Sequence, residues 1–158
     1  MVSAILAAGL AAPAVAAPDS HGIAAAGTQC YPNTKTFKRG TTQRTVTINL
    51  CVQRIGSSTL RAYADISMGK KSGTPDIVYD ATLNVRLEHN DDPIESTADS
   101  MGYEINDESA SAWGWIVSTD EFSSTVVGGW SADGVVYYDL VGDGLGTQAW
   151  ELHGSPTI

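Results

Sequence analysis

The sequence has no lysine or arginine after Arg86. Residues 1–86 hold nine basic and four acidic residues, a net charge of +5, and residues 87–158 hold fourteen acids, a net charge of −14. Binding to nucleic acid without sequence preference, and attraction to anionic membranes, both need clustered lysine and arginine. We therefore expect neither a nucleic acid nor a membrane as the partner.

Signatures of catalysis are also lacking. The chain contains no G-x-S-x-G elbow and no H-E-x-x-H motif, and its three histidines lie far apart along the sequence. Gly142, Gly144 and Gly146 precede a predicted strand, whereas a phosphate-binding loop precedes a helix. We expect no enzymatic activity and no cofactor.

One segment partly matches the opening of a calcium-binding loop, Asp139–Gly144. Calcium gathers six to eight oxygen ligands, but Val141 and Trp150 occupy two of the positions where such ligands are needed. The pattern favours a glycine-rich turn and disfavours calcium. Asp139 and Asp143 remain weak candidates for a metal site, and we expect none.

The first segment predicts export. Ala4–Ala17 is small, apolar and too short to span a bilayer, as is typical of a secretory signal peptide, and Ala14-Val15-Ala16 matches a cleavage site. We expect a signal peptide at 1–16, a flexible N-terminal arm at 17–29, and a single β domain at 30–158 in a secreted, extracellular protein.

Cysteine is scarce, with only Cys30 and Cys51 present. An even pair in a secreted chain predicts one disulfide. The bond would close a loop of about twenty residues, which corresponds to roughly 3 kcal/mol in the loop-entropy model.

Alternation of apolar and polar residues dominates the mature chain. Thr45–Gln53 and Leu60–Ile66 alternate with period two around Gly56-Ser57-Ser58, which predicts a hairpin, and Ile77–Glu88 is the clearest further strand. No helical period is present. The pattern indicates an all-β chain, folded as a single antiparallel β-sandwich or small barrel with one disulfide.

The acid-rich stretch His89–Ala110 predicts a long solvated excursion with a short strand at Met101–Ile105. Asp133-Gly134 predicts a two-residue turn. The remaining strands are expected at Trp113–Ser118, Ser124–Trp130, Val135–Val141 and Gln148–Leu152.

Several residues are candidates for binding a partner. Adjacent Tyr137 and Tyr138 must point to opposite faces of a strand, so at least one is exposed. Trp115 is left undecided between the core and a surface platform. The arm is a segment that could dock by adding a strand. The candidate set is Ile23, Lys35, Phe37, Lys38, Arg39, Trp115 and Tyr138.

Two alternatives to a protein-binding module stay open. Lys35–Arg39 would form a loop braced by the disulfide, with a basic residue that suits a trypsin-like pocket, as in an inhibitor of an extracellular serine protease. Trp115 or Tyr138 would serve a carbohydrate-binding module through ring stacking.

The closing stretch carries a resemblance. It runs from Trp130 through Asp133-Gly134 and Gly142–Gly144 to Trp150–Pro156, and it resembles small secreted actinomycete proteins of mostly unassigned function. It is also similar to the adaptor subunit of umbrella-shaped antibacterial toxin particles. That resemblance implies a non-catalytic adaptor in an extracellular complex, one that joins a lectin-bearing subunit to a toxin stalk. It assigns no binding residues.

The signal-peptide prediction is tested by the mass of the secreted protein. We expect the secreted chain to begin near Ala17, because cleavage follows the A-x-A pattern. Intact-mass measurement of the protein from culture medium checks this. A mass that retains Met1 would contradict it.

Overall fold

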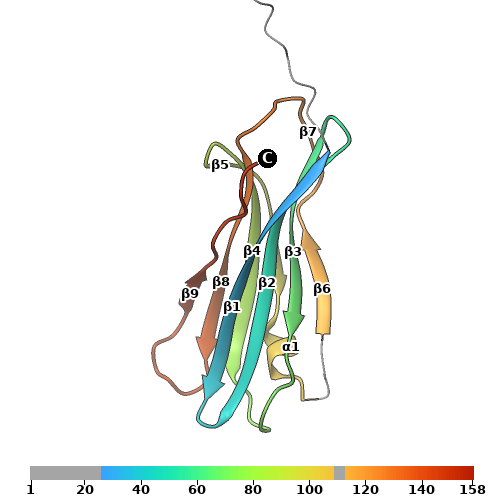
Figure 1. Cartoon of the computed structure of the whole chain (residues 1–158). Helices are drawn as coiled ribbons and strands as arrows, with labels where there is room; N and C mark the ends of the chain where they lie inside the picture. Colours follow the sequence, from blue (N-terminus) through green and yellow to red (C-terminus); the bar gives the residue numbers. More distant parts are fainter. Residues whose placement is uncertain (1–25, 109–112) are drawn as a thin grey trace, which may run out of the picture.

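The structure, a computed structural model, describes residues 26–108 and 113–158. It is mostly β (Figure 1). The elements are β1 (Gly27–Arg39), β2 (Thr42–Ile55), β3 (Thr59–Met68), β4 (Val78–His89), β5 (Asp92–Ser100), α1 (Gly102–Asn106), β6 (Trp113–Ser118), β7 (Phe122–Ser123), β8 (Trp130–Leu140) and β9 (Gln148–Glu151).

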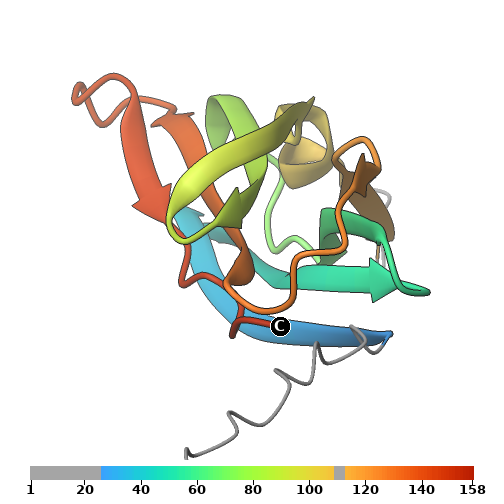
Figure 2. The same cartoon turned by 90° about the horizontal axis from the view of Figure 1, so that it is seen from above.

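Two antiparallel sheets pack face to face, as the view from above shows (Figure 2). Sheet A has the order β1-β2-β3-β6, with β7 also pairing with β3, and sheet B has the order β5-β4-β8-β9. The sheets do not join into a closed barrel. The expected all-β class and single antiparallel sandwich are confirmed.

The core follows the alternation read from the sequence. The inward positions of the central strands are fully buried, among them Ile48, Leu50 and Ile66 in sheet A and Leu83 and Val85 in sheet B. Each such side chain contributes about 1.5–3 kcal/mol when it is fully buried. The predicted β2–β3 hairpin is confirmed.

The predicted disulfide is confirmed, and it joins neighbouring strands. Cys30 and Cys51 lie directly opposite each other in β1 and β2, with their Cα atoms 4.1 Å apart. The chain that the disulfide encloses is itself a hairpin, which turns at residues 40–41. The expected loop at Lys35–Arg39 is therefore wrong, because these residues pair with β2 along their whole length.

The expected solvated excursion at His89–Ala110 is wrong. Asn90 and Asp91 have φ of 54° and 67°, so they form a tight turn between β4 and β5, a conformation that asparagine and aspartate tolerate. The expected strand at Met101–Ile105 is instead a short helix, α1, with Met101 as its N-cap. The side chains of Met101 and Ile105 are fully buried. The acids of β5 misled the prediction because this edge strand is largely exposed.

The expected turn at Asp133-Gly134 is also wrong, because β8 runs through it without a break. A Cβ at Gly134 would lie 2.7 Å from the backbone oxygen of Asn84 in β4, so the glycine permits close approach of two strands and does not form a turn. Of the expected strand Ser124–Trp130, only Trp130 is in a strand.

The N-terminal expectations lie mostly outside the described residues. The signal peptide at 1–16, Ile23 and most of the arm at 17–29 fall there. The last three residues of the expected arm, Gly27–Gln29, belong to β1 and pair with β2.

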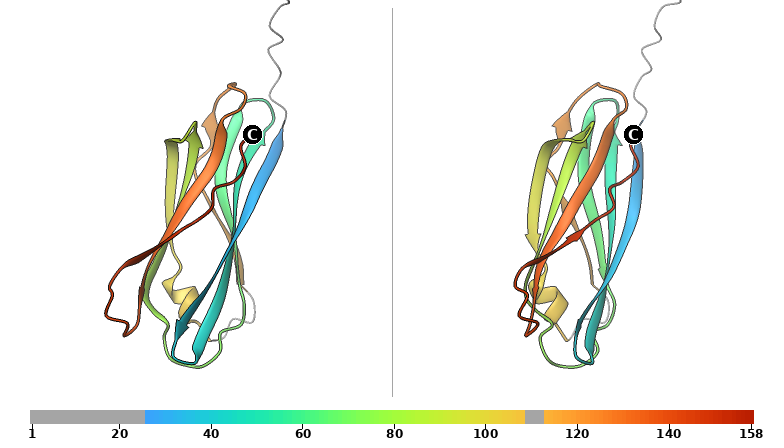
Figure 3. Two further views of the ribbon diagram at one scale, coloured as in Figure 1. Left: turned by 60° about the vertical axis from the view of Figure 1, so that its left-hand side comes forward. Right: turned by 90° about the vertical axis from the view of Figure 1, so that its left-hand side faces the viewer.

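Both open sides of the sandwich are bridged by side chains. On one side, Asn33 of β1 accepts a hydrogen bond from the backbone N–H of His153 (2.7 Å) and donates to its carbonyl (3.1 Å). The C-terminal segment that carries His153 runs up this side between β8 and β1 (Figure 3). On the other side, Trp115 of β6 donates to Asp99 of β5 at 3.0 Å.

Three basic residues are buried near the two ends of the sandwich, the upper end that carries β7 and the lower end that carries α1 (Figure 1). Arg54 donates to the carbonyls of Ser124 and Val126 at the upper end. Arg44 donates to the carbonyl of Asp107 at the lower end, and Lys71 to those of Thr74 and Asn106. Burial lowers the pKa of Arg44, although nearby carboxylates oppose this. These cations stabilise loops and are not available to a partner.

Asn33→Ala should loosen the C-terminal segment. The change leaves the N–H and carbonyl of His153 without their partner, which we expect to cost about 1–3 kcal/mol of unfolding free energy. Chemical denaturation measures the cost, and hydrogen exchange should show faster exchange in residues 153–158. Asn49→Ala is the control, since the Asn49 side chain makes no hydrogen bond within the described residues. Equal effects of the two changes would contradict the bridging role.

Candidate functional site

Two of the predicted partner-binding residues are buried. Phe37 is 1% exposed and Tyr138 is 6% exposed, so the prediction that they form a surface is wrong. Tyr137 is the outward member of the adjacent pair, at 46% exposed. Sequence alone established that the two rings point to opposite faces, but only packing against sheet A decided which ring was covered.

Lys35 lies over these buried rings. Its Nζ is 4.7 Å from the centre of the Tyr138 ring, 5.8 Å from that of Trp150 and 6.0 Å from that of Phe37. The Phe37 ring also contacts each of the other two rings edge to face. A cation over aromatic faces is attracted to them. This cluster therefore closes the open side between β1 and β9, and Lys35 acts within the chain.

Lys38 and Arg39 are exposed at the lower end of β1, where Arg39 donates to the carbonyl of Asp76 at 2.9 Å. Trp115 is half-buried between β6 and β5. The structure brings Lys35, Phe37 and Tyr138 together as a packing cluster and leaves the other described candidates, Lys38, Arg39 and Trp115, apart from it.

The two metal candidates, Asp143 and Asp139, lie in a turn and in a strand. Asp143 accepts hydrogen bonds from the N–H of Leu145 and the side chain of Gln148, at 2.9 and 2.7 Å, which shapes the turn before β9. Asp139 lies in β8. In the part of the chain that the structure describes, no group of three or more His, Cys, Asp or Glu residues is placed to hold a metal ion.

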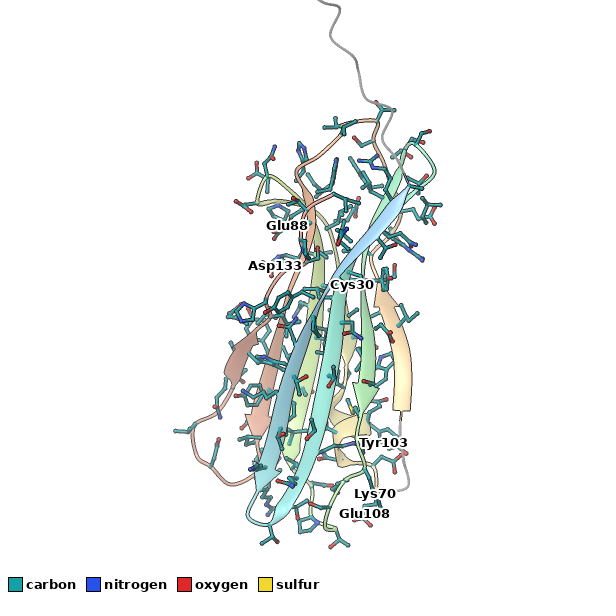
Figure 4. All side chains as sticks on the ribbon, viewed as in Figure 1. Cys30, Lys70, Glu88, Tyr103, Glu108 and Asp133 are labelled. Atoms are coloured by element: carbon teal, nitrogen blue, oxygen red, sulfur yellow. A yellow bond between two sulfur atoms is a disulfide. The ribbon has the colours of Figure 1, made fainter. Side chains whose placement is uncertain are left out.

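A cavity that sequence reasoning missed lies at the upper end of sheet B. Its volume is about 360 Å³. The polar residues that line it come from β4, the β4–β5 turn, β8 and the C-terminal segment, and they include Glu88, Asp91, Ser131, Asp133, His153 and Ser155. Figure 4 shows Glu88 and Asp133 close together there, far from the labelled residues of the lower end.

Arg86 organises the floor of this cavity. Its Nε donates to Oε1 of Glu88 at 3.0 Å, and its Nη2 donates to Oδ2 of Asp133 at 2.7 Å. The sheet register explains the arrangement, because Arg86 and Asp133 are directly opposite in β4 and β8. Burial works to lower the pKa of Arg86, but the hydrogen bonds and charges of the two carboxylates outweigh it and raise that pKa.

The C-terminal segment forms the wall of the cavity. Ser155 is 8% exposed, and it donates its N–H to the carbonyl of Ala132 while its Oγ accepts from the N–H of Ala132, each at 2.9 Å. Farther along, Ile158 donates its N–H to the carbonyl of Trp130. The segment therefore continues the pairing of β9 along the edge of β8 and fixes the wall in place.

The two sheets carry opposite charge. The strands of sheet A hold six basic residues and one acid, a net charge of +5. The strands of sheet B hold one basic residue, Arg86, and eight acids, a net charge of −7. Because the shared interior is apolar, the acids of sheet B lie on its outer face and edges.

No protein-family model, curated protein or solved structure matches this chain. Within the described ranges, no helix is long and apolar enough to cross a membrane. The site is therefore characterised by its own geometry: an acidic cavity built by β4, β8 and the C-terminal segment.

Arg86→Met should destabilise the fold through Glu88. A buried carboxylate would lose its cationic partner, which we expect to lower the unfolding free energy by about 1–3 kcal/mol. Adding Glu88→Gln should recover part of this loss, because the amide carries no charge to be left unpaired. Urea denaturation of the single and double variants at neutral pH measures the coupling.

Arg61→Met is the matched control, since Arg61 is also half-buried but bonds only a neutral partner, Gln53, at 2.8 Å. If Arg86→Met costs no more than Arg61→Met, or if Glu88→Gln recovers nothing, the pairing of Arg86 with Glu88 does not stabilise the site.

Proposed function

We propose that this chain is a secreted, non-catalytic protein-binding module that acts as an adaptor in an extracellular complex. The observation that carries the proposal is the separation of charge between the sheets, with a net −7 on the strands of sheet B and a cavity in that same sheet. Complementary charge steers association and discriminates between partners.

Exposed tyrosines on the acidic sheet support the proposal. Tyr79 in β4 is 70% exposed and Tyr137 in β8 is 46% exposed. Tyrosine is enriched in protein interfaces because its ring buries apolar area while its hydroxyl stays hydrogen-bonded. Asp80 follows Tyr79 in β4, and Asp139 lies two residues after Tyr137, on the same face of β8. A basic protein surface complements this combination.

The cavity supports recognition more than catalysis. Ser155 uses its hydroxyl to bind the backbone of Ala132 and Pro156. Within the described residues, no hydroxyl in the cavity is hydrogen-bonded to His153 or to a carboxylate. An activated nucleophile needs such a base within hydrogen-bond reach.

The disulfide supports the part of the proposal that places the protein outside the cell. The disulfide between Cys30 and Cys51 is typical of proteins in oxidising compartments. The resemblance to the adaptor subunits of antibacterial toxin particles agrees with a non-catalytic role outside the cell. No observation favours the two alternatives, a protease inhibitor and a carbohydrate-binding module. Lys35–Arg39 forms a strand and not a binding loop. Trp115 is half-buried and Tyr138 is buried, so neither offers a fully exposed ring for a sugar to stack on.

Affinity capture from native culture supernatant tests the proposal, with the full secreted chain as bait. We expect a stoichiometric extracellular protein that re-forms the complex when both components are purified. Binding should weaken steeply toward about 1 M salt, where the Debye length falls to about 3 Å. If the chain elutes alone at low salt, the proposal fails.

Charge variants identify the face that binds. The test variant neutralises three exposed or half-exposed acids of sheet B: Asp80→Asn, Asp139→Asn and Glu151→Gln. The control neutralises three exposed acids on the side of sheet A: Asp65→Asn, Asp120→Asn and Glu121→Gln. We expect a loss of affinity of about tenfold or more from the first variant only. Equal losses would contradict binding through sheet B.

A further inference from the structure

Glu88 lines the cavity, and one of its two carboxylate oxygens has no hydrogen-bond partner among the described residues. Its side chain is 10% exposed, and Oε1 accepts the hydrogen bond from Arg86. Oε2 accepts no hydrogen bond from any residue that the structure describes, and it is not fully buried, so it is open to the cavity. A carboxylate that is nine-tenths buried is costly unless its oxygens have partners. The cavity beside Glu88 is therefore a place where a hydrogen-bond donor is favoured.

The charge of the cavity specifies a cationic donor. Three carboxylates, from Glu88, Asp91 and Asp133, line it, and Arg86 offsets only one of them, which leaves a net charge of −2. A concave site lined by one sign of charge focuses the field and raises the local concentration of the opposite charge.

The size of the cavity favours a side chain over a metal ion. Its volume of about 360 Å³ is in the range of sites for organic groups. The described residues place no set of three metal ligands there, and the guanidinium of Arg86 already lies against two of the carboxylates. A lysine or arginine side chain brings both the charge and several donors on a flexible stem.

We propose that this cavity receives an arginine or lysine side chain of a basic protein partner, whose cationic head donates to Glu88. The inference rests on the proposed function and deepens it, because it names the chemistry of the partner and the pocket that anchors it. Asp133 stays bound to Arg86 and to the N–H of Gly134, and so fixes the floor of the cavity. A charge-assisted hydrogen bond in a recessed site is the type of contact that dominates binding energy.

The pocket is tested with a small probe that does not require the partner. The full secreted chain, labelled with ¹⁵N, is titrated with Nα-acetyl-arginine amide at low salt, and Nα-acetyl-citrulline amide serves as the neutral isostere. We expect saturable shifts at the amides of Glu88, Asp91, Asp133 and His153 with a Kd of about 1–10 mM, and no saturation with citrulline. Equal responses to the two probes, or no response to arginine, would overturn the proposal.

Two variants distinguish binding of the arginine probe in the cavity from general electrostatic attraction to an acidic protein. Glu88→Gln should weaken the arginine probe about tenfold, and Glu121→Gln, which removes the same charge from an exposed position on the side of sheet A, outside the cavity lining, should change affinity less than about twofold. Equal weakening by both variants would mean that only long-range charge acts, and would overturn the proposal. A thermal melt of each variant confirms that it is folded.

The outcome is distinguishable from that of the proposed function. A purified partner that binds the Glu88→Gln variant as tightly as the unchanged protein overturns the pocket assignment and leaves the adaptor proposal standing. Saturable arginine binding that Glu88→Gln abolishes, in a protein that captures no partner, supports the pocket and overturns the adaptor proposal.

Discussion

Each sheet must bury one face against the other, and the rest of the structure depends on this constraint. The interior admits the apolar residues of alternating positions, such as Leu50 and Leu83, and excludes unpaired charge. Charges on the strands are therefore confined to outer faces, edges and ends. A sequence whose basic and acidic residues fall in different halves becomes a sandwich with one basic sheet and one acidic sheet, because the first three strands pair in sheet A and most later strands in sheet B.

The basic residues of sheet A and the acidic residues of sheet B have different roles. Arg44 and Arg54, both in β2, are buried and bind loop carbonyls, and Lys35 packs over aromatic rings. The cations of sheet A thus serve largely to stabilise the fold. The acids of sheet B have fewer partners within the chain, apart from those that Arg86 holds. Surplus charge that the fold does not use is available for recognition, and for this reason the acidic sheet is the better candidate for a binding face.

Local patterns in the sequence predicted the fold well where they reflected a simple physical rule. Period-two alternation located β2, β3 and β4, and two cysteines predicted one disulfide. The same rules failed where a residue type has two uses. Asp133-Gly134 resembles a turn, yet the glycine is needed for close strand approach, and the acids after His89 belong to an exposed edge strand. Composition alone does not distinguish these uses, since burial of the neighbours decides between them.

By itself, the sequence determined the all-β class, the disulfide and the division of charge, because each follows from residue type and short-range spacing. Only the tertiary structure decided the site. Glu88, Asp133 and His153 are far apart in the chain, and they meet because β4 pairs with β8 and the C-terminal segment pairs with the edge of β8. Long-range register of this kind depends on how all the strands pack together. No local pattern encodes it, and so the cavity had no signature in the sequence.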